Sequence, residues 1–253
     1  MNKSRILKEL INSDETLIMP DAYNPLSAKL IEKAGFKAIQ CSGYSFAVAA
    51  GYPDEIYVNL DENIQWTREI VDSVNIPVMA DAEDGYGGPE EVLDTVERFI
   101  EIGVAGLNLE DQILDGRRGG SVIDEDLMME KIMIAREMAE IKNNNDFIIN
   151  ARTDALRSTE SRDDGLEIAI DRVKQYLYAG ADLAFITYVE TMDEVEKITR
   201  EVNGPVSVAA GLPYNMKNFS IKDLQKFGVA RVSLPTLLMS SCLYSMEKSL
   251  KLV

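Results

Sequence analysis

Residues 78–88 read VMADAEDGYGG, a short apolar run that ends in acids and then breaks into glycine. Alternate side chains of a β-strand point to the same face, so Asp81 and Glu83 are expected to point the same way, with Asp84 in the following turn. Two carboxylates held side by side repel each other unless a cation or a basic group lies between them. The stretch therefore predicts either a strand that ends at a cation site or a helix-capping turn with solvated acids.

Similar apolar runs alternate with amphipathic stretches along the chain of 253 residues. Strands are predicted at residues 16–22, 37–42, 77–83, 106–111, 146–153, 182–188, 205–210 and 229–234. Helices are predicted at residues 1–11, 25–34, 61–74, 89–102, 126–141, 164–179, 192–202, 221–227 and from 235 onward, with an irregular segment at 43–60.

These eight strand–helix units predict an α/β fold, a (β/α)8 TIM barrel in which residues 1–253 form one domain. Glycine turns stand just before four of the strands, at Gly35, Gly103, Gly180 and Gly228, as is typical of a parallel barrel. The strand runs are almost continuously apolar, which indicates burial on both faces. A doubly wound open sheet is the alternative fold.

Composition excludes several classes of function. The net charge of −17 argues against binding to nucleic acid or to anionic membranes, which require basic patches. No apolar run approaches the roughly 20 residues of a membrane span, and the N-terminus lacks the apolar core of a signal peptide. Two cysteines, Cys41 and Cys242, favour a reduced cytoplasmic protein over one that depends on disulfides.

The chain contains no histidine. This excludes Ser-His-Asp and Cys-His catalysis and zinc sites built on imidazole. General acid or base chemistry must therefore fall to Asp, Glu, Tyr, Lys, Cys or water. A bound metal is expected to be one that prefers oxygen ligands, either Mg²⁺ or Mn²⁺.

Polar residues gather at the predicted strand ends, where the active site of an α/β barrel lies. In chain order they are Asp21, Ser42, Gly43, Asp81, Glu83, Asp84, Glu110, Asp111, Arg152, Asp154, Tyr188, Glu190, Gly211, Asn215 and Ser233. Acids dominate, so we expect an acidic funnel around one cation. Arg152 is predicted to hold a substrate carboxylate or phosphate in a bidentate fork, the alternative being a buried ion pair with Asp154 or Glu110.

Seven motifs together resemble the isocitrate lyase/phosphoenolpyruvate mutase superfamily over nearly the whole chain. They are PDAYN at 20–24, CSG at 41–43, GYPD at 51–54, ADAEDGYG at 80–87, GLNLED at 106–111, NARTDA at 150–155 and GVARVS at 228–233. The resemblance implies a Mg²⁺-dependent enzyme that handles an α-oxo or α-hydroxy carboxylate through a pyruvate-like enolate. It also implies a homodimer or homotetramer with a swapped C-terminal helix.

The same resemblance assigns roles to individual residues. Asp81 is expected to bind the metal directly, with Asp54, Glu83 and Glu110 around it. The substrate's carboxylate and oxo group are expected to lie against Ser42, Gly43 and Arg152. Asn215 is predicted as a further substrate-binding residue from its place after a predicted strand, not from the resemblance. Apart from the resemblance, Arg152, Glu110 and Tyr44 are the predicted catalytic residues. Cleavage of a 2-hydroxy acid needs a base for the hydroxyl group, and Tyr44, Tyr188 and Glu190 are the candidates for it.

One loop departs from the family pattern. Residues 115–120 read DGRRGG. In the corresponding loop, the lyases of the family that the chain resembles carry a Lys-Arg-Cys-Gly-His sequence, and the phosphonomutases carry Lys and Asn. Arg117 and Arg118 are predicted to clamp a second carboxylate or a phosphoryl group, the alternative being a solvated surface pair. The general acid or base is therefore not identified by the motif.

Three functions remain open from the sequence. The predicted one is cleavage of a C–C bond in a small 2-hydroxy- or 2-oxo-carboxylate, in the manner of an oxaloacetate decarboxylase or a methylisocitrate lyase. The first alternative is P–C chemistry on a phosphonopyruvate-like substrate. The second alternative is a non-catalytic protein that binds an oxo acid.

Overall fold

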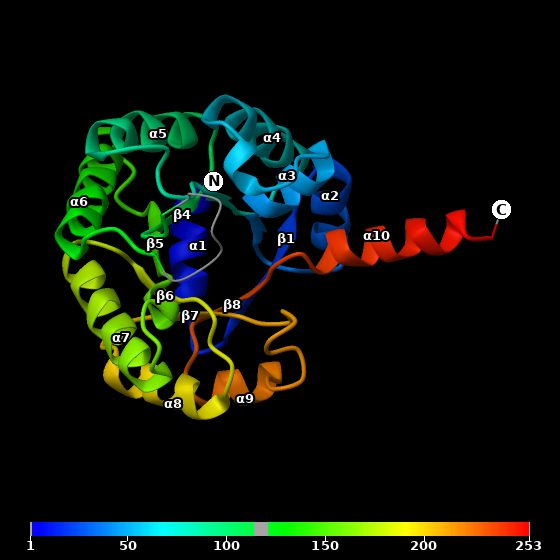
Figure 1. The fold of residues 1–253 in the computed structure, drawn as a ribbon. Helices are drawn as coiled ribbons and strands as arrows, with labels where there is room; N and C mark the ends of the chain where they lie inside the picture. The colour runs from blue at the N-terminus through cyan, green and yellow to red at the C-terminus, as the bar shows by residue number, and fades with distance from the viewer. Residues whose placement is uncertain (1, 114–120, 253) are drawn as a thin grey trace.

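Eight parallel strands pair in chain order, and β1 also pairs with β8, so that the sheet closes into a barrel (Figure 1). The structure is a computed structural model that describes residues 2–113 and 121–252. The strands are β1 (Leu17–Ala22), β2 (Ile39–Cys41), β3 (Val78–Asp81), β4 (Gly106–Glu110), β5 (Ile148–Thr153), β6 (Leu183–Ile186), β7 (Val206–Ala209) and β8 (Arg231–Leu234). The closed barrel confirms the TIM-barrel prediction and excludes the open sheet.

Helices between the strands form the outer ring seen in Figure 1. They are α2 (Pro25–Lys33), α3 (Gly43–Ala50), α4 (Leu60–Ser73), α5 (Pro89–Glu101), α6 (Glu125–Ile141), α7 (Arg162–Tyr178), α8 (Met192–Glu201) and α9 (Ile221–Lys226). Many begin at residues that cap helices well: Asn24 and Asn59, for example, accept a hydrogen bond from the third backbone N–H of α2 and α4.

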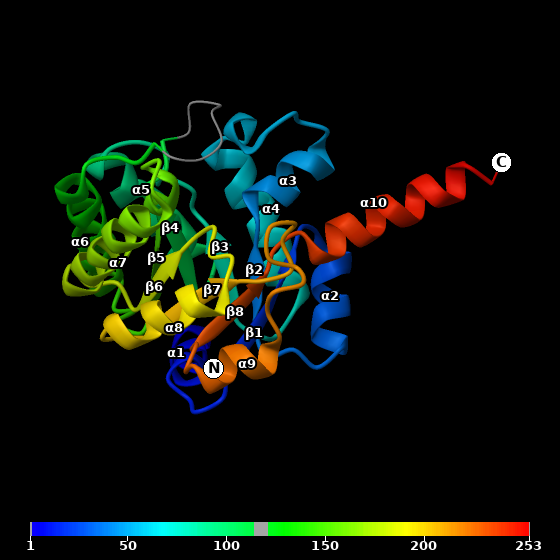
Figure 2. The same ribbon diagram turned by 60° about the horizontal axis from the view of Figure 1, so that its bottom comes forward.

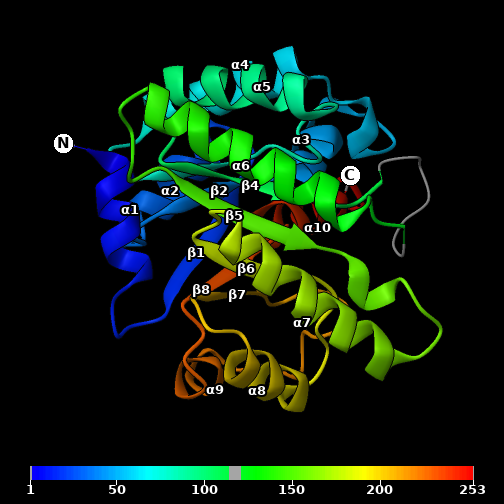
Figure 3. The ribbon, with the colours of Figure 1, turned by 90° about the vertical axis from the view of Figure 1, so that its left-hand side faces the viewer.

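The amphipathic helix α1 (Lys3–Ile11) closes the end of the barrel from which the strands start (Figure 3). Its buried residues Leu7 and Ile11 belong to one apolar cluster with Leu17, Ala38 and Ile148, which lie at or just before the first residues of strands. Because apolar side chains close this end of the barrel, the pocket is expected at the opposite end, where the strands finish.

The segment predicted to be irregular, residues 43–60, contains helix α3 and a short 3₁₀ helix, Glu55–Tyr57. That prediction was wrong because α3 has no polar–apolar periodicity to reveal it. Tertiary contacts support this helix instead: Phe46 packs on Trp66 of α4, with ring centroids 5.6 Å apart. Its ends follow common rules, since the Ser42 hydroxyl caps the Ser45 N–H at 3.3 Å and Gly51 ends it at a φ of 77°.

The last helix, α10 (Leu237–Leu250), projects away from the barrel (Figures 1 and 2). Met239 is its one buried residue, whereas Tyr244 and Leu250 are 68% and 76% exposed. Apolar side chains at such positions lose their hydrophobic stabilisation unless another surface covers them. Within the described residues, no helix has both the length and the apolar character required to cross a membrane.

Candidate active site

A pocket of about 410 Å³ lies at the ends of the strands and extends into the barrel. Its lining includes residues from strands or strand ends all around the barrel, together with the loop after β7 and the start of α10: Asp21, Gln40, Ser42, Tyr44, Glu55, Asp81, Glu83, Asn108, Glu110, Gln112, Arg152, Phe185, Thr187, Tyr188, Ala209, Leu212, Pro213, Tyr214, Ser233, Pro235, Thr236 and Ser240. This volume suits a small metabolite rather than a polymer.

Three buried acids converge in the pocket. Asp81 ends β3, Glu83 lies two residues later, and Glu110 ends the neighbouring strand β4. One carboxylate oxygen from each lies within 4.8 Å of the others. Asp81 Oδ1 and Glu83 Oε1 are buried without a hydrogen-bond partner among the described residues, which is costly for a carboxylate unless a cation is available. The arrangement therefore fits a metal ion that prefers oxygen ligands.

Gly43 lies directly against this cluster of acids. Its backbone N–H donates to Asp81 Oδ2 at 3.1 Å. A Cβ atom at position 43 would stand 1.6 Å from Glu83 Oε1, so only glycine leaves room for that carboxylate. The start of α3 thus shapes the cation site through close backbone approach.

The turn after β3 holds Glu83 in an unusual backbone conformation. Glu83 has a φ of 50° and Tyr86 a φ of 62°, a region that few residues other than glycine adopt. Side chains from three helices secure this turn: Asn63 of α4 donates to the Asp81 carbonyl at 2.8 Å, Thr95 of α5 to the Gly85 carbonyl at 3.1 Å, and Lys131 of α6 to the Asp84 carbonyl at 2.7 Å. The ring of helices therefore holds the carboxylates in place.

Replacing the buried Lys131 with methionine is expected to weaken divalent-metal binding about tenfold, because supporting contacts of this kind orient the ligands. The unfilled hydrogen bond of the Asp84 carbonyl should also lower the free energy of unfolding by about 1–3 kcal/mol. Calorimetric titration with Mn²⁺ and denaturant unfolding measure the two effects. Lys142→Met, at the far end of α6, is the matched control because Lys142 pairs only with surface acids. Equal metal affinity in both variants would show that Lys131 does not support the metal site.

Burial raises the pKa of each acid in the cluster. For Asp81 the Gly43 N–H and the Arg152 guanidinium partly offset this effect. For Glu83 the negative charges of Asp81 and Glu110 add to it. For Glu110 the charge of Arg152 opposes the effect of burial on the pKa. A bound cation would compensate this concentration of buried negative charge.

Arg152, on β5, is the cation beside the cluster. It forms an ion pair with Glu110, and its Nε and Nη2 atoms donate to Asp154 at 2.8 and 3.1 Å. Nη2 also donates to Gln112 at 3.0 Å. Both ion pairs considered as alternatives from the sequence are present, and Arg152 nevertheless lines the pocket. Acids on two sides hold its guanidinium in one orientation.

The other predicted site residues lie in different places. Ser42 and Tyr44 line the pocket, Ser42 as the N-cap of α3. Asp54 caps the short helix Glu55–Tyr57 and lies outside the cluster of three acids. Arg117 and Arg118 lie outside the described residues. The roles predicted for these residues stay predictions.

Asn215 is buried beside the pocket and bonded to the backbone. Its Nδ2 donates to the carbonyls of Val189 and Ala209 at 3.0 and 2.9 Å, and its Oδ1 accepts from the Leu212 N–H at 3.1 Å. These bonds fix the loop whose residues Leu212 and Tyr214 line the pocket. Its direct contact with a substrate stays a prediction.

Sequence reasoning missed several lining residues, among them Gln40, Asn108 and Gln112. Asn108 pairs in register with Asp81 and accepts a hydrogen bond from Asn150 at 2.5 Å. A signal for it existed, because Asn108 lies two residues before Glu110 and hence on the same face of β4. The signal was weak because β4 is buried on both faces and shows no alternation.

Comparisons with known proteins agree with this geometry. The family profile of phosphoenolpyruvate phosphomutase matches residues 7–253. The chain is 31% identical over 207 residues to 2,3-dimethylmalate lyase of Eubacterium barkeri, covering 81% of this chain and 70% of the relative. It is 35% identical over 201 residues to the chloroplastic carboxyvinyl-carboxyphosphonate phosphorylmutase of Arabidopsis thaliana, covering 77% of this chain and 58% of the relative.

A solved structure of oxaloacetate acetylhydrolase with its product oxalate has the same fold. The TM-score is 0.89 at 26% identity, and the match covers 98% of this chain and 86% of the other. Carbon–carbon lyase activity on small carboxylates fits the relatives named for 2,3-dimethylmalate and oxaloacetate, and it also fits the pocket. By the extent of the family match, the chain belongs to the phosphoenolpyruvate phosphomutase family and thus to the isocitrate lyase/phosphoenolpyruvate mutase superfamily of enzymes.

Proposed function

We propose that this protein is a Mg²⁺-dependent lyase, with Mn²⁺ as a substitute, that cleaves a C–C bond of a small 2-hydroxy- or 2-oxo-carboxylate. One observation carries the proposal: Asp81, Glu83 and Glu110 direct carboxylate oxygens to one point beside Arg152, in a pocket sized for a metabolite. The relatives named for 2,3-dimethylmalate and oxaloacetate support the substrate class.

The residues present fit the metal. Asp81 and Glu83 each offer a buried oxygen without a partner, and Glu110 completes a set of hard oxygen ligands. When bound, the ion supplies positive charge beside the oxygen on which an enolate develops. In the described part of the chain, no cysteine lines the pocket, so carboxylates and phenols are the side chains available for proton transfer.

The chain's own groups hold the substrate and receive the products. Arg152, with Ser42 and Gly43, would hold the carboxylate and the oxo group, so that the C–C bond to be broken points into the pocket. In a 2-oxo acid such as oxaloacetate, the bond would break with loss of CO₂, and its electron pair would form the enolate of pyruvate. In a 2-hydroxy acid, a base, for which Tyr44, Tyr188 and Glu190 are the candidates, would take the hydroxyl proton, so that cleavage leaves an oxo acid and the enolate of the other carboxylate fragment. Tyr44 and Tyr188, which line the pocket, are the proposed proton donors to the enolate carbon, and Tyr44 is preferred because it follows Gly43 directly.

A substrate panel tests the proposal. The purified protein with Mg²⁺ is incubated with oxaloacetate, 2,3-dimethylmalate, 2-methylisocitrate and phosphonopyruvate, and pyruvate, CO₂, glyoxylate and phosphate are followed. We expect pyruvate or a 2-oxo acid from at least one carbon substrate, with loss of activity when EDTA removes the metal. Release of phosphate alone would show that the protein cleaves a P–C bond rather than a C–C bond. Binding of oxo acids without turnover of any substrate would identify a non-catalytic binding protein.

We further propose a homodimer or homotetramer assembled through α10, in a cytoplasmic location. The support for assembly is the row of exposed apolar residues on a projecting helix: Leu237, Leu243, Tyr244, Met246 and Leu250. A second copy of the chain is the proposed cover for them. The location is supported by the two cysteines, which are both free thiols.

Tyr244→Glu is expected to raise the dissociation constant of the oligomer at least about tenfold, because a carboxylate in an apolar interface is costly to desolvate. Light scattering coupled to size exclusion, over a range of protein concentrations, measures the change. Tyr178→Glu on α7, where Tyr178 is 86% exposed, is the matched control. A wild-type chain that is monomeric at all concentrations would refute this assembly.

A further inference from the structure

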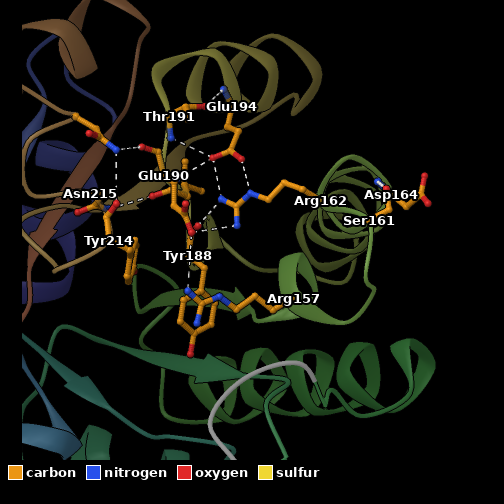
Figure 4. A network of polar contacts seen from close by, with 12 residues as sticks. Arg157, Ser161, Arg162, Asp164, Tyr188, Glu190, Thr191, Glu194, Tyr214 and Asn215 are labelled. Atoms are coloured by element: carbon orange, nitrogen blue, oxygen red, sulfur yellow. Dashed lines mark hydrogen bonds and ion pairs between the residues drawn. The ribbon is translucent and has the colours of Figure 1, made fainter.

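Arg157 lies against two tyrosines that line the pocket. It ends the short helix Ala155–Arg157 that follows β5. Its Cζ atom lies 3.6 Å from the ring centroid of Tyr188 and 5.7 Å from that of Tyr214. Figure 4 shows the guanidinium lying along the Tyr188 ring. Because both tyrosines line the pocket, the guanidinium of Arg157 lies beside the aromatic wall of the pocket.

The hydrogen-bond donors of Arg157 are not used within the described residues. The neighbouring arginines Arg136, Arg152, Arg162 and Arg172 each donate at least three hydrogen bonds. Arg157 has only a long ion pair, with 3.9 Å between its Nη2 and Glu190 Oε1. The same Glu190 oxygen lies closer to Arg162, at 3.3 Å. Arg157 therefore presents a guanidinium fork without an acceptor, and its side chain is 39% exposed.

The surroundings hold Arg157 in this position. Tyr188 has a φ of 63°, and its carbonyl accepts a hydrogen bond from Arg162 Nη2 at 2.7 Å. Arg162 is in turn fixed by two bonds to Glu194, at 2.6 and 3.0 Å (Figure 4). The tyrosine on which Arg157 rests is thus anchored by a network of charged groups. Such preorganisation lowers the entropic cost of binding an anion at the fork.

The pocket needs a second cation if its substrate carries two carboxylates. The charged residues that line it, within the described chain, are Arg152 and the acids Asp21, Glu55, Asp81, Glu83 and Glu110. Arg152 is already paired with Glu110 and Asp154. A metal and Arg152 together can hold one carboxylate, but a second carboxylate farther out would meet mainly negative charge among the described lining residues. A guanidinium fork at the wall would offset that repulsion.

We infer that Arg157 binds the second carboxylate of a dicarboxylate substrate and so selects dicarboxylates over monocarboxylates. This inference rests on the proposed function. Arg157 is a specificity-determining residue in it, separate from the acids and Arg152 that hold the reacting end. The aromatic wall of Tyr188 and Tyr214 orients the fork, and Arg162 positions Tyr188.

The test compares matched pairs of 2-oxo acids that differ only in the group farthest from the oxo group, which is a carboxylate in one member and a methyl group in the other. These are oxaloacetate with 2-oxobutyrate, and 2-oxoglutarate with 2-oxovalerate, each measured by displacement of radiolabelled oxalate in the presence of Mn²⁺. The unaltered protein is expected to bind at least one dicarboxylate about tenfold more tightly than its monocarboxylate partner. Arg157→Met should reduce that preference to less than about threefold, while the affinities for oxalate and the monocarboxylates stay unchanged.

Two further variants separate charge from geometry. Arg157→Lys keeps the charge without the fork, so it should retain part of the preference for dicarboxylates. Arg5→Met removes one positive charge at the opposite end of the barrel. This variant should keep the full preference for dicarboxylates. Unchanged preference in Arg157→Met, or an equal loss of affinity for both members of each pair, would overturn the inference. If no 2-oxo acid or oxalate binds the unaltered protein, the proposed function fails and the inference fails with it.

Discussion

Asp81→Asn is expected to reduce metal-dependent turnover about a thousandfold while the barrel stays folded. The asparagine oxygen can still accept the Gly43 N–H, which lies 3.1 Å from Asp81 Oδ2. The variant loses the negative charge of the ligand, and it loses Asp81 Oδ1, the oxygen that has no hydrogen-bond partner in residues 2–113 and 121–252. Steady-state kinetics on the substrate found by the panel, with a Mn²⁺ titration, measure the loss of rate and of metal affinity.

Asp94→Asn is the control for this change, because Asp94 is an exposed acid on α5 whose ion-pair partner in the described part of the chain is Arg98. It alters the net charge by the same amount and should leave the rate and metal affinity as they are. Circular dichroism and thermal unfolding should show that the Asp81 variant remains folded. A turnover number equal to that of the unaltered enzyme in Asp81→Asn would exclude Asp81 as a metal ligand.

Gly43→Ala is expected to have a second large effect, through packing rather than charge. The added methyl group would overlap with Glu83 Oε1, at 1.6 Å, and lie 2.8 Å from Glu83 Cδ. Glu83 must therefore leave its place, and the strain should cost about 1–3 kcal/mol of unfolding free energy. With one carboxylate displaced, we expect the affinity for Mn²⁺ to fall at least about tenfold. Denaturant unfolding and calorimetric titration measure the two quantities.

Gly88→Ala provides the matched control, since a Cβ there would come no closer than 3.3 Å to Glu91 Oε2. It should cost less than about 1 kcal/mol and leave the metal affinity unchanged. A double variant then identifies the cause of the Gly43 effect. Adding Glu83→Ala to Gly43→Ala should restore most of the lost stability, because the overlapping group is gone, but it should not restore metal affinity. Additive losses of stability in the double variant would contradict the contact between these two residues.

The sequence was sufficient for the fold. Short apolar runs separated by amphipathic stretches are local features, and each glycine turn before a strand depends on a few neighbouring residues. The eight predicted strands correspond to β1–β8, although each strand is one to three residues shorter than predicted. The one clear failure, the helix Gly43–Ala50, depends on a contact between Phe46 and Trp66, residues twenty positions apart, which no local pattern could reveal.

The site was only partly predictable. Strand-end position alone identified Asp81, Glu83, Glu110 and Arg152, because the strands of a parallel barrel all end at the same face. It could not rank the acids. The family resemblance gave Asp54 the same place around the metal as Glu110, yet Asp54 caps a short helix outside the three converging carboxylates. It also could not show that Asn215 bonds three backbone groups, because those groups come together only in the folded loop.

By itself, the sequence determined the barrel, its acidic face and the family to which the chain belongs, because these follow from residue types and spacings that act locally. Only the tertiary structure decided which acids share one point, why position 43 must be glycine, and that Arg157 lies against Tyr188 without a hydrogen bond to any described residue. Those facts depend on the register of neighbouring strands and on the closure of the sheet, which bring together residues that are far apart in the chain.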